Sequence, residues 1–215
     1  MLKKLHYNTV TPLLKTILLQ LMSEPLFDHF RLVGGTSLSL QIGHRESIDI
    51  DLFSDAPYDS IDFNEIELYF TRSFAYTDSL NINVIGFGKS FFLGNSKDDC
   101  IKVDLYYTDP YIRPVLLKDS IRLASIEDII AMKIDVISRT GRKKDFWDIH
   151  ELLNTYTIEQ MLQLHKERNP YTHERNEIVT NLTNFTEADS DFEPKCLRHK
   201  IWEFIKLDII DIVGI

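Results

Sequence analysis

The pattern of apolar and polar positions changes character near residue 124. Before that point the apolar residues form short runs or alternate with polar ones, as at 30–33, 47–53, 80–87 and 100–107, which predicts β-strands. Beyond it, apolar residues recur every three or four positions, beginning with 126–137, which predicts helices. We therefore expect an α/β (α+β) chain with a short mixed sheet and a C-terminal helical lobe.

Helix starts are marked by residues that suit N-caps. Thr11 before Pro12, Asp62, and Ser125 with Asp128 three residues later each precede an apolar repeat of helical spacing. The pattern also predicts helices over 157–169, 172–185 and 195–212, with an acidic linker at 186–194. We expect two units, a core over 1–124 and a helical lobe over 125–215 that closes a cleft.

Two glycines follow the first predicted strand. Phe30–Val33 runs into Gly34 and Gly35, and helical spacing resumes directly afterwards with Thr36 at its start. Glycine lets the backbone approach a ligand closely, and a helix N-terminus offers free N–H groups with a positive dipole. This turn is therefore a candidate phosphate-binding site.

The next strand carries two acids on one face. In the run Ser47–Phe53, polar and apolar residues alternate, so Asp49 and Asp51 share a face, while Ile48 is expected in the core with Ile50 and Leu52. Two neighbouring carboxylates repel unless one is protonated or a divalent cation lies between them. An isolated Asp-x-Asp is more often a solvated strand face. Its position after Gly34 and Gly35 favours a magnesium site that handles nucleotide phosphates.

A third acid lies on a later strand. Asp104 interrupts the apolar run 100–107, where a buried acid would need a partner. Two-metal phosphoryl chemistry generally uses a third carboxylate that holds a metal near the attacking hydroxyl and can accept its proton. The alternative is a lone acid on a solvent-facing strand.

Lys133 aligns with the apolar stripe of its predicted helix. Such a lysine needs an anion, which a triphosphate or the metal-binding carboxylates would supply; otherwise its stem packs while the ammonium reaches water. Beyond it, Arg139, Arg142, Lys143 and Lys144 form a basic cluster that either neutralises a helix C-terminus or binds phosphates.

Composition and charge limit the remaining possibilities. The 215 residues carry a formal net charge of −9, which argues against a broad basic nucleic-acid surface and leaves local patches to bind any such substrate. The two cysteines make no ligand cluster and no disulfide framework, so a reducing cytoplasm is expected. His165, His173 and His199 lack ligand spacing and are expected at the surface. No apolar stretch is long enough for a membrane span.

The spacing of these motifs resembles a known superfamily. Gly34-Gly35, thirteen residues, and then Asp49-Ile50-Asp51 is similar to the signature of polymerase-beta-type nucleotidyltransferases. The finer pattern GGTSLSLQIGHRESIDIDLF resembles the AbiEii/AbiGii nucleotidyltransferase toxin family. The likeness is strongest over residues 31–53 and 124–153, where Ala131-Met132-Lys133 and the Lys-Asp-Phe-Trp-Asp-Ile run also fit.

The resemblance implies roles for the site residues. Gly34, Gly35 and Thr36 would hold the β- and γ-phosphates of an NTP, and two Mg²⁺ ions would bind Asp49, Asp51 and Asp104. Lys133 would contact phosphates, and Arg45 with Ser47 would brace the site. Asp145 would join the active site or orient Lys133. Both Asp145 and Asp148 also suit a helix start, so the sequence does not decide which of them is functional.

The implied function is the transfer of NMP from an NTP to an acceptor hydroxyl, with the 3′ end of tRNA as the expected acceptor. The implied biology is the toxin of a toxin–antitoxin or abortive-infection system in phage defence, partnered by a transcription-regulating antitoxin that need not form a stable complex. Two alternatives stay open. The acceptor could be a small molecule or a protein, or the chain could be an inactive nucleotide-binding module.

Overall fold

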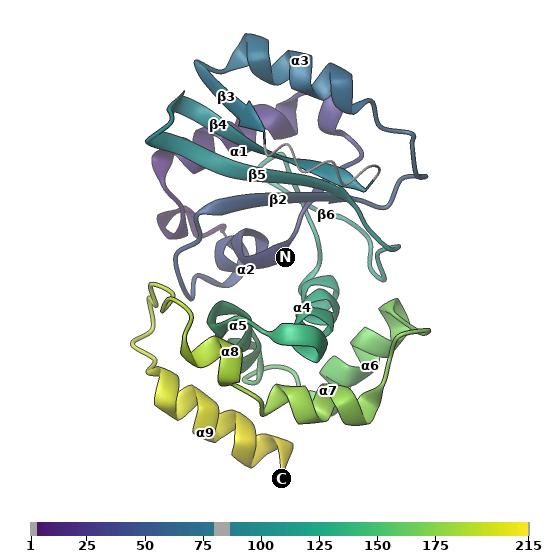
Figure 1. Cartoon of the computed structure of the whole chain (residues 1–215), viewed down its shortest axis with the longest axis vertical. Helices are drawn as coiled ribbons and strands as arrows, with labels where there is room; N and C mark the ends of the chain where they lie inside the picture. The colour runs from purple at the N-terminus through teal and green to yellow at the C-terminus, as the bar shows by residue number, and fades with distance from the viewer. Residues whose placement is uncertain (1–3, 80–86, 215) are drawn as a thin grey trace.

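The computed structural model describes residues 4–79 and 87–214. Its strands form one half of the molecule and a group of helices the other, as Figure 1 shows with the sheet above and the helices below. The strand predicted over 80–87 falls almost wholly outside the described residues. No helix of the described part is both long enough and apolar enough to cross a membrane.

A seven-stranded mixed sheet, of order β3-β4-β5-β2-β1-β7-β6, organises the first half. Its central strand β2 runs parallel to β5 and antiparallel to β1, and β1 runs parallel to β7. The mixed sheet predicted from the sequence is confirmed. The strands are β1 (Arg31–Leu32), β2 (Asp49–Ser54), β3 (Tyr76–Ser79), β4 (Gly88–Ser96), β5 (Asp99–Tyr107), β6 (Leu116–Lys118) and β7 (Ile121–Leu123).

The helices of the first half begin at the expected caps. Thr11 Oγ1 accepts a hydrogen bond from the Leu14 amide at 3.1 Å, and the Asp62 carboxylate accepts from Asn64 N and Glu65 N. Short polar side chains satisfy helix N–H groups that otherwise lack partners. These elements are η1 (Tyr7–Thr9), α1 (Pro12–Ser23), η2 (Pro25–Phe27), α2 (Gly34–Ile42) and α3 (Phe63–Ser73).

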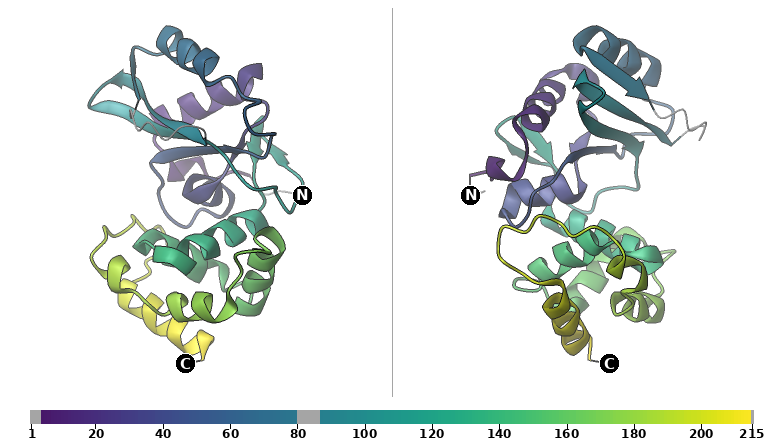
Figure 2. Two further views of the ribbon diagram at one scale, coloured as in Figure 1. Left: turned by 45° about the vertical axis from the view of Figure 1, so that its right-hand side comes forward. Right: turned by 60° about the vertical axis from the view of Figure 1, so that its left-hand side comes forward.

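The regular elements in the described part of the second half are helices, as predicted. Its first helix is capped by Ser125 Oγ, which accepts from the Asp128 amide at 2.9 Å. Figure 2 shows these helices grouped beneath the sheet, with the last one farthest from it. They are α4 (Ile126–Thr140), α5 (Lys143–Leu152), α6 (Ile158–Arg168), α7 (Arg175–Leu182), α8 (Thr186–Asp189) and α9 (Trp202–Val213).

The described part of the structure has two buried apolar clusters, and the second of them extends from the C-terminal helices to Val33 and Leu38 at α2. One lies between the sheet and the helices α1 and α3, and includes Phe27, Phe70 and Phe91. The other lies among the C-terminal helices, where Trp147 stacks on Trp202 with ring centroids 6.4 Å apart. Because apolar burial drives folding, the second cluster stabilises the C-terminal helices and also joins them to α2. The division into 1–124 and 125–215 stays a prediction.

Several local expectations were wrong. Ile48 is 70% exposed, because β2 begins only at Asp49 and leaves Ile48 outside the strand ladder. The segment 186–194 includes the one-turn helix α8, and the final helix begins at Trp202, not at residue 195. Residues before α9 instead join their backbone to the loop after α2, with the Glu46 amide donating to the Lys195 carbonyl at 2.9 Å.

Candidate active site

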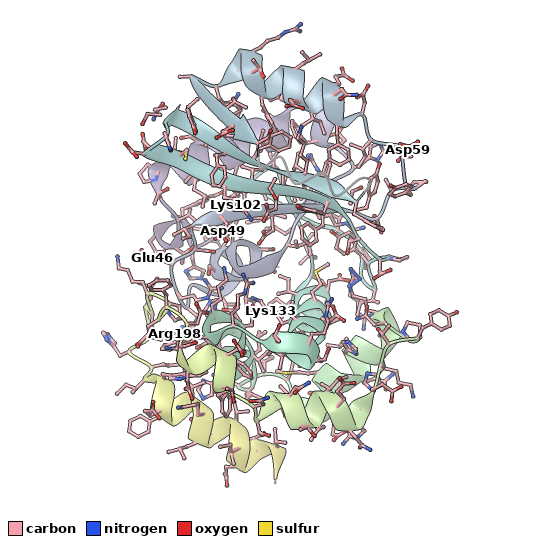
Figure 3. The ribbon with its side chains drawn as sticks, viewed as in Figure 1. Glu46, Asp49, Asp59, Lys102, Lys133 and Arg198 are labelled. Carbon is pink, nitrogen blue, oxygen red and sulfur yellow. The ribbon has the colours of Figure 1, made fainter. Side chains whose placement is uncertain are left out.

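Three predicted acids meet at one edge of a shared cavity. Asp49 and Asp51 project from β2 and Asp104 from its parallel neighbour β5, with Asp51 directly opposite Asp104 in the ladder. All three line a cavity of about 270 Å³ between the sheet and helices α4 and α5. In Figure 3 the labelled Asp49 lies on the sheet side of this region and Lys133 on the helical side. We call Asp49, Asp51 and Asp104 the carboxylate rim.

The rim concentrates negative charge. Burial, together with the neighbouring carboxylates of Asp49 and Asp104, raises the pKa of Asp51 from 3.8 to about 6. Lys102 Nζ donates to Asp104 Oδ2 at 2.6 Å, and Lys144 Nζ lies 3.4 Å from Asp49 Oδ2. No ion pair or hydrogen bond to the Asp51 carboxylate occurs in the described residues. The rim therefore contains three acids but only two neutralising ammonium groups.

The glycine turn faces the rim. Gly34 has φ +63°, and a Cβ there would lie 2.3 Å from Asp51 Oδ2, so only glycine fits between α2 and β2. No side chain among the described residues caps the N-terminus of α2. Its first amides and the helix dipole therefore remain available to an anion in the cavity.

A buried ionic network lies behind the cavity, centred on Asp148. Arg45 donates to it through Nε at 2.6 Å and Nη2 at 2.8 Å, His44 Nε2 lies 2.7 Å away, and Lys133 Nζ lies 2.7 Å away. Although burial alone would raise the pKa of Asp148, Arg45 and Lys133 hold it well below its usual range. We call Asp148, Arg45, His44, Lys133 and Asp145 the Asp148 network.

Lys133 has carboxylate partners inside the protein. Its Nζ donates to Asp145 Oδ1 at 2.6 Å in addition to its contact with Asp148. Burial opposes the charged form of Lys133, but these two acids outweigh it and raise the pKa of the ammonium. Lys133 and Asp145 both line the cavity. Asp145 can orient Lys133 through this hydrogen bond. Asp148 contacts Lys133 as well, together with Arg45 and His44.

Thr36, Ser47 and Arg45 lie beside the cavity and do not line it. The Thr36 hydroxyl is 2.8 Å from Ser47 Oγ and also donates to the Asp49 carbonyl, so its side chain holds the start of β2. Arg45 lies beneath Gly35, where an added Cβ would be 2.3 Å from Nη2. Gly34, Gly35, Lys133, Asp145 and the three rim acids do line the cavity together.

Sequence reasoning missed Lys102 and His44. Lys102 is two residues before Asp104 and therefore on the same strand face, which alternation alone could have revealed. His44 contacts Asp148 across 104 residues of sequence, and no local pattern predicts such a contact. His165 was expected at the surface but is fully buried, with its Nδ1 2.9 Å from that of His173.

The rim residues fit a divalent cation by their chemistry. In the described residues, no three acidic, histidine or cysteine side chains are already arranged closely enough to hold a metal ion. Two of the rim carboxylates are occupied by lysines, yet Asp104 Oδ1 is buried and has no hydrogen-bond partner in the described structure. Oxygen donors with unbalanced negative charge are the ligands that Mg²⁺ prefers.

Solved structures of nucleotidyltransferases share this fold. The MenT4 nucleotidyltransferase toxin Rv2826c from Mycobacterium tuberculosis H37Rv matches with a TM-score of 0.54 at 13% identity, over 91% of this chain and 79% of that one. A structure described as a putative nucleotidyltransferase from H. pylori matches with a TM-score of 0.56 at 19% identity, over 92% of this chain and 91% of that one. The chain thus has the overall fold of these two structures.

The family follows from the sequence. Residues 16–210 match the family described as "Nucleotidyl transferase AbiEii toxin, Type IV TA system", and the chain belongs to this family. It is also 29% identical over 148 residues to the uncharacterized protein aq_aa25 of Aquifex aeolicus, a match that spans 64% of each protein. The predicted resemblance is therefore confirmed.

Proposed function

We propose that this chain transfers a nucleoside monophosphate from an NTP to an acceptor hydroxyl, with Mg²⁺ bound at Asp49, Asp51 and Asp104. The observation that carries the proposal is the convergence of three carboxylates from β2 and β5 with the uncapped N-terminus of α2 on one cavity. Mg²⁺ would supply charge neutralisation on the phosphates and lower the pKa of the attacking hydroxyl. Membership of the AbiEii family supports the reaction class.

The protein groups divide the work by position. The amides of Gly34, Gly35 and Thr36 at the start of α2 bind the β- and γ-phosphates. Asp104 accepts the proton of the acceptor hydroxyl, which attacks the α-phosphorus in line while pyrophosphate leaves. Asp145 orients Lys133 through their 2.6 Å contact, so that the ammonium faces the charge that develops on the phosphates. Arg45 and Ser47 brace this arrangement from outside the cavity.

An adjoining cavity suits the acceptor, for which we propose an RNA such as the 3′ end of tRNA. This second cavity, of about 340 Å³, shares Asp49, Arg142 and Lys144 with the first. Its wall also carries Phe192, whose side chain is 93% exposed, and Lys195, which pairs with Glu46 at 2.6 Å; Asp191 and Glu193 add negative charge there. Cations that follow a phosphate backbone and an exposed aromatic ring that stacks on a base are typical of single-strand binding.

As a member of a type IV toxin family, the chain would act as a toxin in the cytoplasm, where NTPs and tRNA are found. Its partner would be an antitoxin that regulates transcription and need not form a stable complex with it. Induction of the wild-type chain should arrest growth, and induction of Asp49→Ala should not. If both proteins arrest growth, the toxicity does not depend on the proposed metal site.

The direct test incubates the protein with each labelled NTP, Mg²⁺ and, separately, total RNA, protein or small-molecule acceptors. We expect label in the RNA with wild type, none with Asp49→Ala, and wild-type labelling with Asp211→Ala, which alters an exposed acid on α9. Circular dichroism would establish that both variants are folded. Retained transfer by Asp49→Ala would refute the assignment, and label in protein or small molecules would replace the RNA acceptor.

A further inference from the structure

The register of the two rim strands places a lysine among the acids. In the parallel ladder, Asp51 lies opposite Asp104 and Asp49 lies opposite Lys102. Like charges directly across a ladder are destabilising, and opposite charges stabilise it. Lys102 therefore neutralises a face that would otherwise present only carboxylates from β2 and β5.

A second lysine reaches the rim from the helical half. Lys144, in the first turn of α5, has its Nζ 3.4 Å from Asp49 Oδ2, while Lys102 Nζ is 2.6 Å from Asp104 Oδ2. The side chains of Lys102 and Lys144 are 38% and 30% exposed, whereas that of Lys133 is 6% exposed and held by two acids. Each of the two rim lysines thus contacts one carboxylate and is partly exposed to solvent. Their ammonium groups can therefore move away from the carboxylates.

Both ammonium groups occupy oxygens that a divalent cation would need. Asp49 Oδ2 and Asp104 Oδ2 are bonded to lysine, whereas Asp51 and the buried Asp104 Oδ1 have no partner in the described structure. A cation that is bound by all three carboxylates would therefore compete with the two lysines for Asp49 Oδ2 and Asp104 Oδ2. The displaced ammonium groups stay beside the same cavity, where a triphosphate brings negative charge.

We propose that Lys102 and Lys144 are built-in counter-ions of the carboxylate rim, which oppose divalent-cation binding in the nucleotide-free protein and transfer to the phosphates of the NTP. This inference rests on the proposed function of the rim. Each lysine should therefore weaken the binding of the divalent cation and strengthen the binding of the NTP. A purely structural lysine would not produce such a reversal, because its loss would weaken both.

The experiment measures Mn²⁺ binding without nucleotide by calorimetry, and then binding of a non-hydrolysable NTP analogue at saturating Mn²⁺. For Lys102→Met and Lys144→Met we expect Mn²⁺ to bind about fivefold more tightly, because a partly exposed competing ion pair is removed. We expect the analogue to bind about tenfold more weakly, because a charged contact to phosphate is lost. Lys102→Arg and Lys144→Arg should restore both affinities toward wild type.

The matched control is Lys89→Met. Lys89 on β4 forms a pair of the same length, 2.6 Å to Glu67, with similar exposure but outside the cavity, so both affinities should be unchanged. Lys102→Gln and Lys144→Gln provide a second pair of neutral variants. Unchanged or weaker Mn²⁺ binding in all neutral rim variants would overturn the proposal. If instead wild type and Asp49→Asn bind Mn²⁺ equally, the metal site of the proposed function itself is wrong.

Discussion

Two groups of acids lie next to each other in this protein, and their surroundings differ. The acids of the Asp148 network are fully engaged: Asp148 alone contacts Arg45, His44 and Lys133, and its pKa is held well below the usual range. In the carboxylate rim, Asp51 has no cationic partner in the described residues and its pKa is raised to about 6. The ion pairs of the Asp148 network stabilise the fold, whereas the acids of the carboxylate rim are only partly neutralised.

This difference separates a structural acid from a ligand-binding one without reference to any relative. A buried acid whose oxygens are all bonded to protein groups contributes to the fold but cannot bind a ligand. An under-neutralised acid costs stability until an external cation arrives. Changes in the Asp148 network should therefore affect stability more than changes in the carboxylate rim.

Asp148→Asn should be the most destabilising change. It would leave the buried guanidinium of Arg45 without its carboxylate partner, and the buried ammonium of Lys133 with Asp145 as its remaining carboxylate partner. We expect the free energy of unfolding to fall by about 3–5 kcal/mol in urea denaturation. Asp49→Asn, on the exposed side of the rim, should change it by less than about 1 kcal/mol. Equal losses of unfolding free energy in the two variants would show that the network and the rim do not differ in their contribution to stability.

The rim should make stability depend on pH through Asp51. Because the pKa of Asp51 is about 6 in the folded state against an ordinary 3.8, the folded state binds the extra proton between these values. Its contribution to the free energy of unfolding is thus unfavourable above pH 6 and disappears below about pH 4.

Asp51→Asn, which cannot ionise, reveals this contribution. In metal-free solution it should be more stable than wild type by about 3 kcal/mol at pH 7, because each unit of the pKa difference corresponds to about 1.4 kcal/mol. The gain should vanish near pH 4. Unfolding curves of both proteins across this pH range provide the measurement, and a gain that does not vary with pH would refute the raised pKa.

Gly34→Ala should disturb the rim from the other side. The added Cβ would collide with Asp51 Oδ2, and φ +63° is itself unfavourable for alanine. Gly214→Ala is the matched control, since Gly214 has φ +75° but no atom within 4 Å of an added Cβ. We expect Gly34→Ala to be less stable than Gly214→Ala by about 1–2 kcal/mol and to lose Mn²⁺ affinity. Identical behaviour would mean that Asp51 moves away at no cost.

Thr36→Val should have the smallest effect. It removes the hydroxyl that contacts Ser47 Oγ and the Asp49 carbonyl, while keeping the branched shape. The expected loss is about 1 kcal/mol of stability, with a modest reduction in transfer because β2 begins at Asp49. A loss of transfer as complete as in Asp49→Ala would show that the Thr36 hydroxyl itself contacts the nucleotide.

Local chemistry made much of this structure predictable from the sequence. The caps at Thr11, Asp62 and Ser125 and the turn at Gly34 depend on neighbouring residues, and each is found where expected. Alternation likewise placed Asp49 and Asp51 on the same face of β2. Such features are set by backbone geometry within a few residues.

The features of the site that the sequence did not predict depend on contacts between residues that are far apart in the chain, and no local pattern encodes such contacts. The register that sets Lys102 opposite Asp49 joins strands 53 residues apart (102 − 49), and the partners of Lys133 come from a different helix. The final helix begins late because residues 195–197 bond to the loop after α2. The sequence indicated that Lys133 needs an anion, and only the fold shows that Asp145 and Asp148 are in place to provide it.

The most direct test of the central claim is a crystal structure of the protein soaked with Mn²⁺ and a non-hydrolysable NTP analogue, with Mn²⁺ located by its anomalous scattering. We expect anomalous density among Asp49, Asp51 and Asp104, with the triphosphate at the N-terminus of α2. Manganese bound elsewhere, or a triphosphate remote from Gly34 and Gly35, would contradict this claim.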